Sequence, residues 1–373
     1  MQEITAEELF MEFESEIEFA IIDVRNEDDY SRFNIEGPRQ IENLNIPFDD
    51  FLSDEEQAIA QIPLNKAIRV ICAKEESSAM IAAIINANGI DEIGFLRGGI
   101  NAWGDLLIPR LLKDDTYELW QFIRPAKASC SYALINDGEM FLFDPSRSLE
   151  FYDDFMKSKE VVLKMVFETH LQADYLSGGP YFNAPYAVHQ DDFDSAPFDF
   201  HSIQDDELFN LQDVHVRCIH SPGHTPGSMT YIIDDKWMIS GDTVFIVSIG
   251  RPDLGKKVVE WSRTLFNTLK TRISTLPGEL VVLPSHFSDW HSESDEDLCI
   301  SKSFADVIKQ NEEIYGIEDI EQFVDWVKEN MREQPPEYDD IRLFNSGKLD
   351  LDEEQKIILD LGKNQCAAST HVI

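Results

Sequence analysis

The chain has 373 residues, of which 71 are acidic and 31 are basic, so its formal net charge is −40 at neutral pH. Such an excess of negative charge repels phosphate backbones and anionic membrane surfaces, and it excludes nucleic acid as an expected partner. The length exceeds one ordinary hydrophobic core, so two domains of roughly 100 to 250 residues are expected.

The chain contains no apolar run of about 18 residues, the length that a membrane-spanning helix needs. Its first residues, "MQEITAEELFMEFESEIE", are acidic, whereas a secretory signal peptide begins with a basic segment. We therefore expect a cytoplasmic protein without a membrane partner.

The 5 cysteines are spread along the chain, and none belongs to a Cys-x-x-Cys pair. An odd number of widely spaced cysteines indicates neither a disulfide framework nor a zinc ribbon. Cys130, Cys218 and Cys299 lie in apolar contexts typical of buried structural thiols. Cys366 is interpreted as a tail residue without a catalytic role.

Residues 1–110 are predicted to form a compact α/β domain. "FAIIDVR" (19–25) and "AIRVICA" (67–73) are short apolar runs typical of buried parallel strands, and "IGFLRGG" is a third candidate strand. "SSAMIAAIINANG" (77–89) combines a serine N-cap, helical apolar spacing and a terminal glycine, which predicts a helix. The proline and charged turn in "LLIPRLLKDDT" mark the boundary of this domain.

Residues 115–373 are predicted to form a second domain that begins with β-hairpins. Asn136-Asp137-Gly138 is a turn signal between the strands "CSYALIND" and "EMFLFDPS". Helices are predicted over "LEFYDDFMKSK" and "VVEWSRTLFNTLKTRI", and again over 301–313 and 319–331, before an acidic tail.

Polar side chains end four apolar segments of the second domain: His170 in "ETHLQADY", His224 in "SPGHTPGS", Asp242 in "SGDTVF" and His286 in "LPSHF". Loops at strand ends suit a binding site, because a rigid scaffold fixes the side chains while the loops stay open to substrate. In this order and at these separations, the four stretches resemble the metallo-β-lactamase superfamily over roughly residues 117–300.

Binuclear hydrolases of that superfamily hold one zinc with three histidines, and a second with two histidines, an aspartate and a bridging aspartate. Gln172 and Tyr175 stand at two of the histidine positions in this sequence. The resemblance therefore implies a single metal held by His170, His224 and Asp242. Two imidazoles and a carboxylate are the donors of a facial triad, which leaves positions free on Fe(II) for substrate and O₂.

One branch of the superfamily, the persulfide dioxygenases, has this ligand set. "GDTVFIVSIGRPDL" (241–254) is similar to a stretch of that branch, and the tail "GKNQCAAS" resembles the end of several bacterial members. The resemblance implies one Fe(II) per chain, which oxidises a small, glutathione-like thiol persulfide with O₂ to sulfite and the free thiol. It is also compatible with a homodimer.

Other residues near the expected metal have roles only by this resemblance. Asp174, Tyr175 and His286 are expected to orient the iron ligands through hydrogen bonds. Arg251 is expected to hold a carboxylate of the thiol carrier, for which its planar fork of donors is suited. An ion pair of Arg251 with Asp253 or Asp289 is the alternative.

The first domain resembles the rhodanese family over almost its whole length. "IIDVRNEDDYSRFNIEGPRQIENLNIP" contains the Asp-Val-Arg opening and the Asn-Ile-Pro ending of that family, and "FLRGGINAW" matches its closing stretch. Cys72 stands at the position of the sulfur-carrying cysteine. Its loop, "CAKEESS", places Glu75 and Glu76 beside the thiol, where they repel an anionic sulfur donor. Cys72 is thus either a persulfide carrier or part of a degenerate docking module.

The predicted fold is α/β, with a rhodanese-like parallel-sheet domain followed by a metallo-β-lactamase αββα sandwich. The predicted function is Fe(II)-dependent persulfide oxidation, in which the first domain handles sulfane sulfur. Two alternatives remain: a thioester hydrolase of the glyoxalase II type, and a metal-free protein that binds sulfur species or a partner. The presence of one iron, two zinc ions or no metal separates the three.

Overall fold

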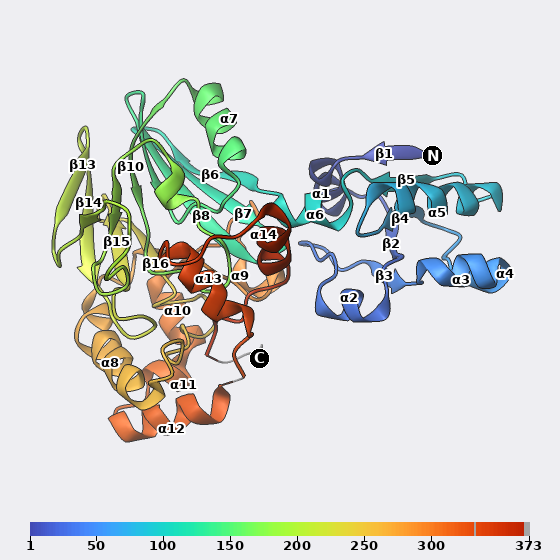
Figure 1. The fold of residues 1–373 in the computed structure, drawn as a ribbon. Helices are drawn as coiled ribbons and strands as arrows, with labels where there is room; N and C mark the ends of the chain where they lie inside the picture. Colours follow the sequence, from blue (N-terminus) through green and yellow to red (C-terminus); the bar gives the residue numbers. More distant parts are fainter. Residues whose placement is uncertain (332, 369–373) are drawn as a thin grey trace. The chain divides into compact units, whose positions relative to one another are not determined.

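The computed structural model describes residues 1–331 and 333–368 (Figure 1). The described chain divides into two compact units, and short segments return to the first unit from later parts of the sequence. The first unit holds Met1–Ile108, Arg124–Lys127 and Leu361–Lys363, and the second unit holds Pro109–Ile123, Ala128–Asp360 and the described residues from Asn364 onward. No helix in the described ranges is both long enough and apolar enough to cross a bilayer.

The first unit is built on a parallel sheet. Its strands are β1 (Gln2–Ile4), β2 (Phe19–Asp23), β3 (Glu42–Asn45), β4 (Ala67–Ile71) and β5 (Ile93–Leu96), in the spatial order β1-β5-β4-β2-β3. All of their pairings are parallel. Every residue of β2 and β4 is buried, as expected for apolar central strands covered on both faces.

Helices cover this sheet and complete the core of the unit. They are α1 (Ala6–Glu14), α2 (Glu27–Arg32), α3 (Phe48–Ser53), α4 (Glu55–Ile59), α5 (Glu75–Ala87) and α6 (Gly99–Asp105). α5 packs on β4 and β5, where Ile81 and Ile85 join the core. The predicted serine N-cap of α5 is wrong: Lys74 occupies that position, so the helix begins at Glu75 and has Glu75 and Glu76 in its first turn.

The strands of the second unit form two sheets. One has the order β12-β11-β10-β9-β8-β7-β6 and the other β13-β14-β15-β16-β17-β18. The strands are β6 (Ile108–Asp114), β7 (Glu118–Arg124), β8 (Ser129–Asn136), β9 (Glu139–Phe143), β10 (Val162–Phe167), β11 (Tyr186–Val188), β12 (His201–Ser202), β13 (Leu208–Leu211), β14 (Val214–His220), β15 (Met229–Ile233), β16 (Trp237–Gly241), β17 (Val281–Pro284) and β18 (Lys302–Ser303). The predicted turn joins β8 to β9, with positive φ at Asp137 and Gly138.

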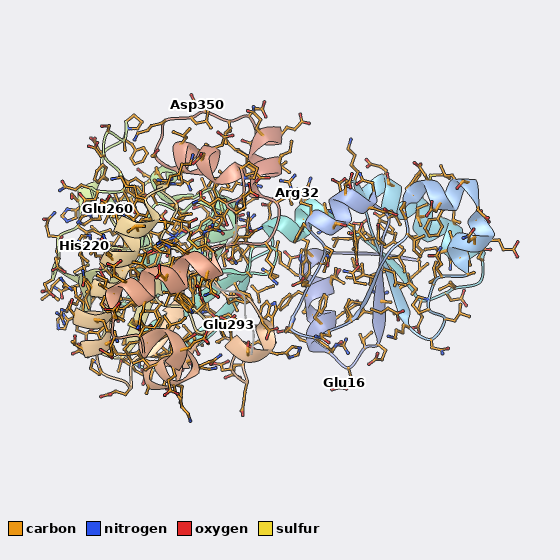
Figure 2. The ribbon with its side chains drawn as sticks, turned by 90° about the horizontal axis from the view of Figure 1, so that it is seen from below. Glu16, Arg32, His220, Glu260, Glu293 and Asp350 are labelled. Carbon is orange, nitrogen blue, oxygen red and sulfur yellow. The ribbon has the colours of Figure 1, made fainter. Side chains whose placement is uncertain are left out.

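Aromatic side chains pack between the two sheets. Phe143 and Phe167, which end β9 and β10, both contact Tyr231 of β15, with ring centroids 5.3 and 5.5 Å apart. This packing holds the ends of strands from both sheets together. Acidic side chains such as Glu260 and Asp350 lie at the surface, in keeping with the net charge (Figure 2).

Helices cover the outer faces of the sandwich (Figure 1). They are α7 (Leu149–Lys159), α8 (Val258–Thr271), α9 (Trp290–Glu293), α10 (Phe304–Gln310), α11 (Glu312–Tyr315), α12 (Ile320–Asn330), α13 (Glu337–Asn345) and α14 (Glu353–Asp360), with 3₁₀ turns at Gly179–Tyr181 and Ile273–Thr275. Aromatic residues of α7 pack edge-on against Phe122 of β7. The predicted acidic tail contains two helices, α13 and α14, because its apolar residues, including Ile341 and Phe344, pack in a core cluster.

Candidate metal centre

The four polar segments of the second unit meet where strands end. His170 follows β10, Asp242 follows β16 directly, His286 follows β17, and His224 lies in the loop between β14 and β15. All four side chains are buried. Gly250 packs tightly against the segments that carry Asp242 and His224. A Cβ at Gly250 would overlap the Asp242 carbonyl oxygen and lie 2.9 Å from His224 Nδ1.

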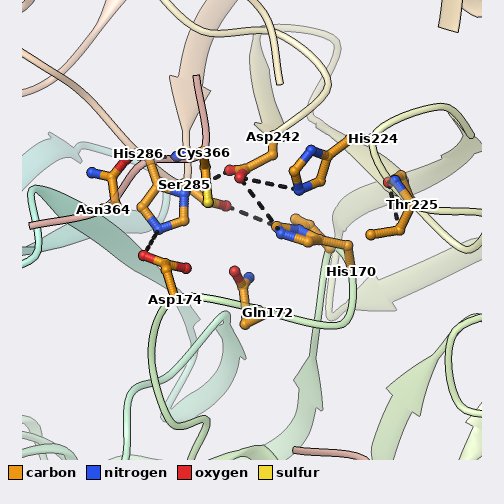
Figure 3. A network of polar contacts seen from close by, with 12 residues as sticks. His170, Gln172, Asp174, His224, Thr225, Asp242, Ser285, His286, Asn364 and Cys366 are labelled. Carbon is orange, nitrogen blue, oxygen red and sulfur yellow. Dashed lines mark hydrogen bonds and ion pairs between the residues drawn. The ribbon is translucent and has the colours of Figure 1, made fainter. Parts of the chain in front are cut away.

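His170, His224 and Asp242 point their side chains at one another (Figure 3). One ligand atom from each lies within 4.8 Å of the others. Asp242 Oδ2 lies 3.7 Å from His170 Nε2 and 3.3 Å from His224 Nε2. Among the residues that the structure describes, none of these three atoms has a hydrogen-bond partner, although all are buried. Buried polar atoms that lack a partner are costly, so the convergence of these three atoms fits a metal cation as their common partner.

The remaining ring nitrogens show which tautomers are present. His224 Nδ1 lies 2.9 Å from the Arg251 carbonyl oxygen, to which it can only donate. His170 Nδ1 lies 2.9 Å from Thr169 Oγ1, whose own hydrogen goes to Asp144 Oδ2 at 2.8 Å. Both imidazoles therefore carry their proton on Nδ1, which leaves the Nε2 lone pairs available for a metal.

Burial and neighbouring charges set the protonation states of this group. Burial lowers the pKa of His170 to about 3 and also lowers the pKa of His224, so both imidazoles are neutral at pH 7. Burial by itself would raise the pKa of Asp242, but His286, His170 and His224 outweigh it and lower that pKa below its usual value. The group thus presents two neutral imidazoles and one carboxylate.

A second group lies on the other side of Asp242. His286 donates from Nδ1 to Asp242 Oδ1 at 2.7 Å, and its Nε2 lies 2.8 Å from Asp174 Oδ2. Burial would lower the pKa of His286, but Asp174 and Asp242 raise it to about 10. Tyr175 donates its hydroxyl to the Asp144 carbonyl oxygen at 3.1 Å and therefore offers no ligand to this group.

Cys366 lies in the second group, a position that its interpretation as a tail residue without a catalytic role did not predict. Its side chain is 0% exposed, and its sulfur lies within 4.8 Å of ligand atoms of Asp174 and His286. The tail is held there by backbone bonds: Arg251 N–H donates to the Cys366 carbonyl at 2.8 Å, and Ala368 N–H donates to the Ile249 carbonyl at 2.8 Å. The similarity of "GKNQCAAS" to family tails was the available signal.

Arg251 is buried beside the centre, and its guanidinium engages Asp253. Nε lies 2.6 Å from Asp253 Oδ1, and Nη2 lies 2.8 Å from Oδ2. Of the two interpretations from the sequence, the structure therefore contains the loop ion pair with Asp253. Arg251 also acts through its carbonyl, which fixes the His224 ring.

In the first unit, Cys72 follows β4 and is 8% exposed. Its carbonyl accepts from Ile100 N–H at 2.9 Å, and Gly99, at φ +63°, allows this approach because a Cβ would lie 2.6 Å from that oxygen. Glu75 Oε2 accepts from Gly98 N–H at 2.9 Å. Cys130, Cys218 and Cys299 are buried, as predicted.

Comparisons with known proteins agree with both units. Residues 6–106 match the family model described as a Rhodanese-like domain. A probable metallo-hydrolase, YqgX of Bacillus subtilis, is 27% identical over 188 residues, which are 44% of this chain and 87% of the relative. The mitochondrial persulfide dioxygenase ETHE1 of Bos taurus is 30% identical over 173 residues, which are 44% of this chain and 65% of the relative.

A crystal structure of a metallo-beta-lactamase from Staphylococcus aureus subsp. aureus COL has a TM-score of 0.56 with this chain, at 21% identity. The match covers 64% of this chain and 75% of that one. The chain therefore contains a rhodanese-like domain and a metallo-β-lactamase fold, and one of its relatives is named a probable metallo-hydrolase.

Proposed function

We propose that the second unit oxidises a small thiol persulfide with O₂, using one Fe(II) held by His170, His224 and Asp242. The observation that carries this proposal is the convergence of His170 Nε2, His224 Nε2 and Asp242 Oδ2, which are buried and have no hydrogen-bond partner among the described residues. The similarity to persulfide dioxygenase ETHE1 supports the same chemistry.

The three side chains fit ferrous iron by donor type and charge. Two neutral imidazoles and one carboxylate form a facial triad, and Gln172 replaces the histidine that a zinc site of the hydrolase type would add. When bound, the iron would supply the redox chemistry that combines the persulfide sulfur with O₂, so no organic cofactor is needed. Each turnover joins one persulfide, one O₂ and one water and yields thiol, sulfite and two protons.

The surrounding residues keep the donors in place. Thr169 and the Arg251 carbonyl hold the two rings through their Nδ1 atoms. His286 holds Asp242 through Oδ1, and Asp174 holds His286 in turn. This chain of contacts leaves Asp242 Oδ2 facing the two histidines, so the geometry of the triad is set before any metal binds.

The first unit is proposed to handle sulfane sulfur through Cys72 or, with that cysteine inactive, to serve as a docking module. The rhodanese-like match supports sulfur handling. Glu75 and Glu76, in the first turn of α5, oppose the binding of an anionic sulfur donor.

A second candidate function is metal-dependent hydrolysis of a thioester, because the relative YqgX is named a probable metallo-hydrolase. Hydrolysis needs a metal-bound water and consumes no O₂. The two candidates therefore differ in a quantity that can be measured directly.

The deciding experiment is O₂ uptake by full-length protein that is purified without oxygen and loaded with Fe(II). Glutathione persulfide should drive O₂ uptake and sulfite formation in a one-to-one ratio. A thioester such as S-lactoylglutathione should not be hydrolysed by the zinc-loaded protein. Thioester hydrolysis without persulfide-dependent O₂ uptake would reject the oxygenase and favour the hydrolase.

A further inference from the structure

We infer that Gln172 is a substrate-contacting residue, whose side-chain amide donates a hydrogen bond to the anionic sulfur of the persulfide that is oxidised. The inference rests on the proposed function, since it names a protein partner for the substrate at the same centre. It concerns a position where this chain differs from the histidine of the binuclear hydrolases.

The amide of Gln172 is buried without a partner in the protein. Gln172 is 1% exposed, and neither its Oε1 nor its Nε2 has a hydrogen-bond partner within residues 1–331 and 333–368. Figure 3 shows the amide directed into the space between His170 and Asp174. A buried polar group without a partner is costly, so this amide fits a role in which a bound molecule supplies the partner.

A second buried glutamine shows that this fold can satisfy such an amide. Gln121 is 0% exposed, and its Nε2 donates to the Tyr132 hydroxyl at 3.2 Å and to the Ile300 carbonyl at 2.9 Å. Its Oε1 accepts from Ile300 N–H at 2.8 Å. The unsatisfied amide of Gln172 is therefore a property of its position, and not of buried glutamine in this chain.

The segment around Gln172 is held by its neighbours. Asn345 of α13 donates from Nδ2 to the Gln172 carbonyl at 2.9 Å, and Leu171 N–H donates to Asp192 Oδ2 at 2.9 Å. Leu171 and Ala173, on either side of Gln172, lie in hydrophobic core clusters. Gln172 is thus kept beside the metal ligands by its backbone and its flanking residues, and its amide takes no part in holding it there.

An amide suits an anionic sulfur substrate. A persulfide anion only accepts hydrogen bonds, and the glutamine NH₂ group offers two donors without adding negative charge. The carboxylates of Asp174 and Asp242 can only accept, and His286 directs its two ring nitrogens at them. The two imidazoles of the triad present lone pairs at Nε2. Gln172 therefore supplies N–H donors that the imidazoles and carboxylates of this centre do not.

The test is sulfite binding to the full-length, Co(II)-loaded protein under anaerobic conditions, followed by the visible absorption of Co(II). Sulfite is the oxidised form of the same sulfur, and it also only accepts hydrogen bonds at neutral pH or above. Gln172→Met keeps the side-chain length and removes both polar atoms. The Kd for sulfite should rise by about 10- to 100-fold, the usual effect of a lost hydrogen bond to a charged group, while Co(II) affinity stays unchanged. Gln190→Met, at an exposed turn residue, is the matched control and should bind sulfite as the wild type does.

Unfolding of the metal-free protein gives a second readout. The free energy of unfolding of Gln172→Met should match or exceed that of the wild type, because an apolar group replaces a buried amide without partners. Gln121→Met should lower it, since this variant loses three hydrogen bonds. Chemical denaturation measures both. A Gln172→Met variant that is as destabilised as Gln121→Met, or that fails to fold, would show that the amide has partners within the protein and would overturn the proposal.

The binding experiment has three further outcomes that overturn the proposal. They are unchanged sulfite binding in Gln172→Met, no sulfite binding by the wild type, and a loss of Co(II) affinity in Gln172→Met, which would make the amide a ligand of the ion. None of these readouts needs turnover. Sulfite binding that depends on Gln172, in a protein without persulfide-dependent O₂ uptake, would reject the oxygenase and leave the contact standing. Persulfide-dependent O₂ uptake with sulfite binding that does not depend on Gln172 would reject the contact alone.

Discussion

The candidate metal centre of the second unit and the Cys72 loop of the first both follow strands, yet they differ in whether their polar atoms are hydrogen-bonded. At the metal centre, His170, His224 and Asp242 each direct a buried atom without a hydrogen-bond partner among the described residues into one space. At the loop, the Cys72 carbonyl and the Glu75 carboxylate already accept backbone N–H groups. A preformed binding site keeps its ligand atoms free of hydrogen bonds within the protein, whereas these two groups of the loop are already hydrogen-bonded to the backbone.

Charge separates the two regions in the same way. The amino end of a helix favours an anion, and the first turn of α5 already contains the acidic residues Glu75 and Glu76. These carboxylates occupy the favourable position that a thiolate or an anionic donor would use. At the metal centre, by contrast, the carboxylate of Asp242 faces two neutral imidazoles and remains available for a cation.

Removal of one metal ligand should produce the largest effect. His224→Ala takes away a nitrogen donor to the metal, so persulfide-dependent O₂ uptake should fall by more than about 100-fold, a larger loss than removal of a residue that only orients a ligand usually causes. Iron content per chain should fall with it. His201→Ala, which removes an exposed histidine of β12, should leave both unchanged. If His224→Ala kept its iron and its activity, the assignment of His224 as a metal ligand would be wrong.

The next largest effect should come from the buried ion pair of Arg251 and Asp253. Arg251→Ala leaves a largely buried carboxylate without its guanidinium, which costs about 3–5 kcal/mol in comparable pairs. Chemical denaturation of the metal-free protein should show this loss, and the double variant with Asp253→Ala should lose less than the sum of the two. A selective rise in KM for the persulfide with unchanged stability would instead support the substrate-binding interpretation.

A smaller effect is expected from the residue that fixes the His170 tautomer. Thr169→Val removes the hydroxyl that accepts from Nδ1 and donates to Asp144, so Fe(II) affinity should fall by about 10- to 100-fold. Competition with an iron chelator measures this change. Thr169→Ser keeps the hydroxyl and should restore most of the affinity. Equal weakening in both variants would show that packing of the methyl group matters more than the hydrogen bond.

The difference between the two regions also explains which parts were accessible from the sequence. His170, Asp242 and His286 follow apolar strands closely, so local pattern and family resemblance placed them at one edge. Cys366 escaped this reasoning because its position depends on pairing of the tail with Gly250, which no local pattern encodes. The early start of α5 was missed because Glu75 and Glu76 act as first-turn residues without a side-chain cap.

The smallest effect is expected at Cys72. Its thiol is mostly buried, and two glutamates follow it in the first turn of α5, so iodoacetamide should alkylate it no faster than free cysteine at neutral pH. Cys72→Ser should likewise leave O₂ uptake with glutathione persulfide unchanged, because the three proposed iron ligands all lie within the second unit. Rapid alkylation, together with a persulfide on Cys72 after incubation with a sulfur donor, would show that the loop is active and that its glutamates do not prevent thiolate chemistry.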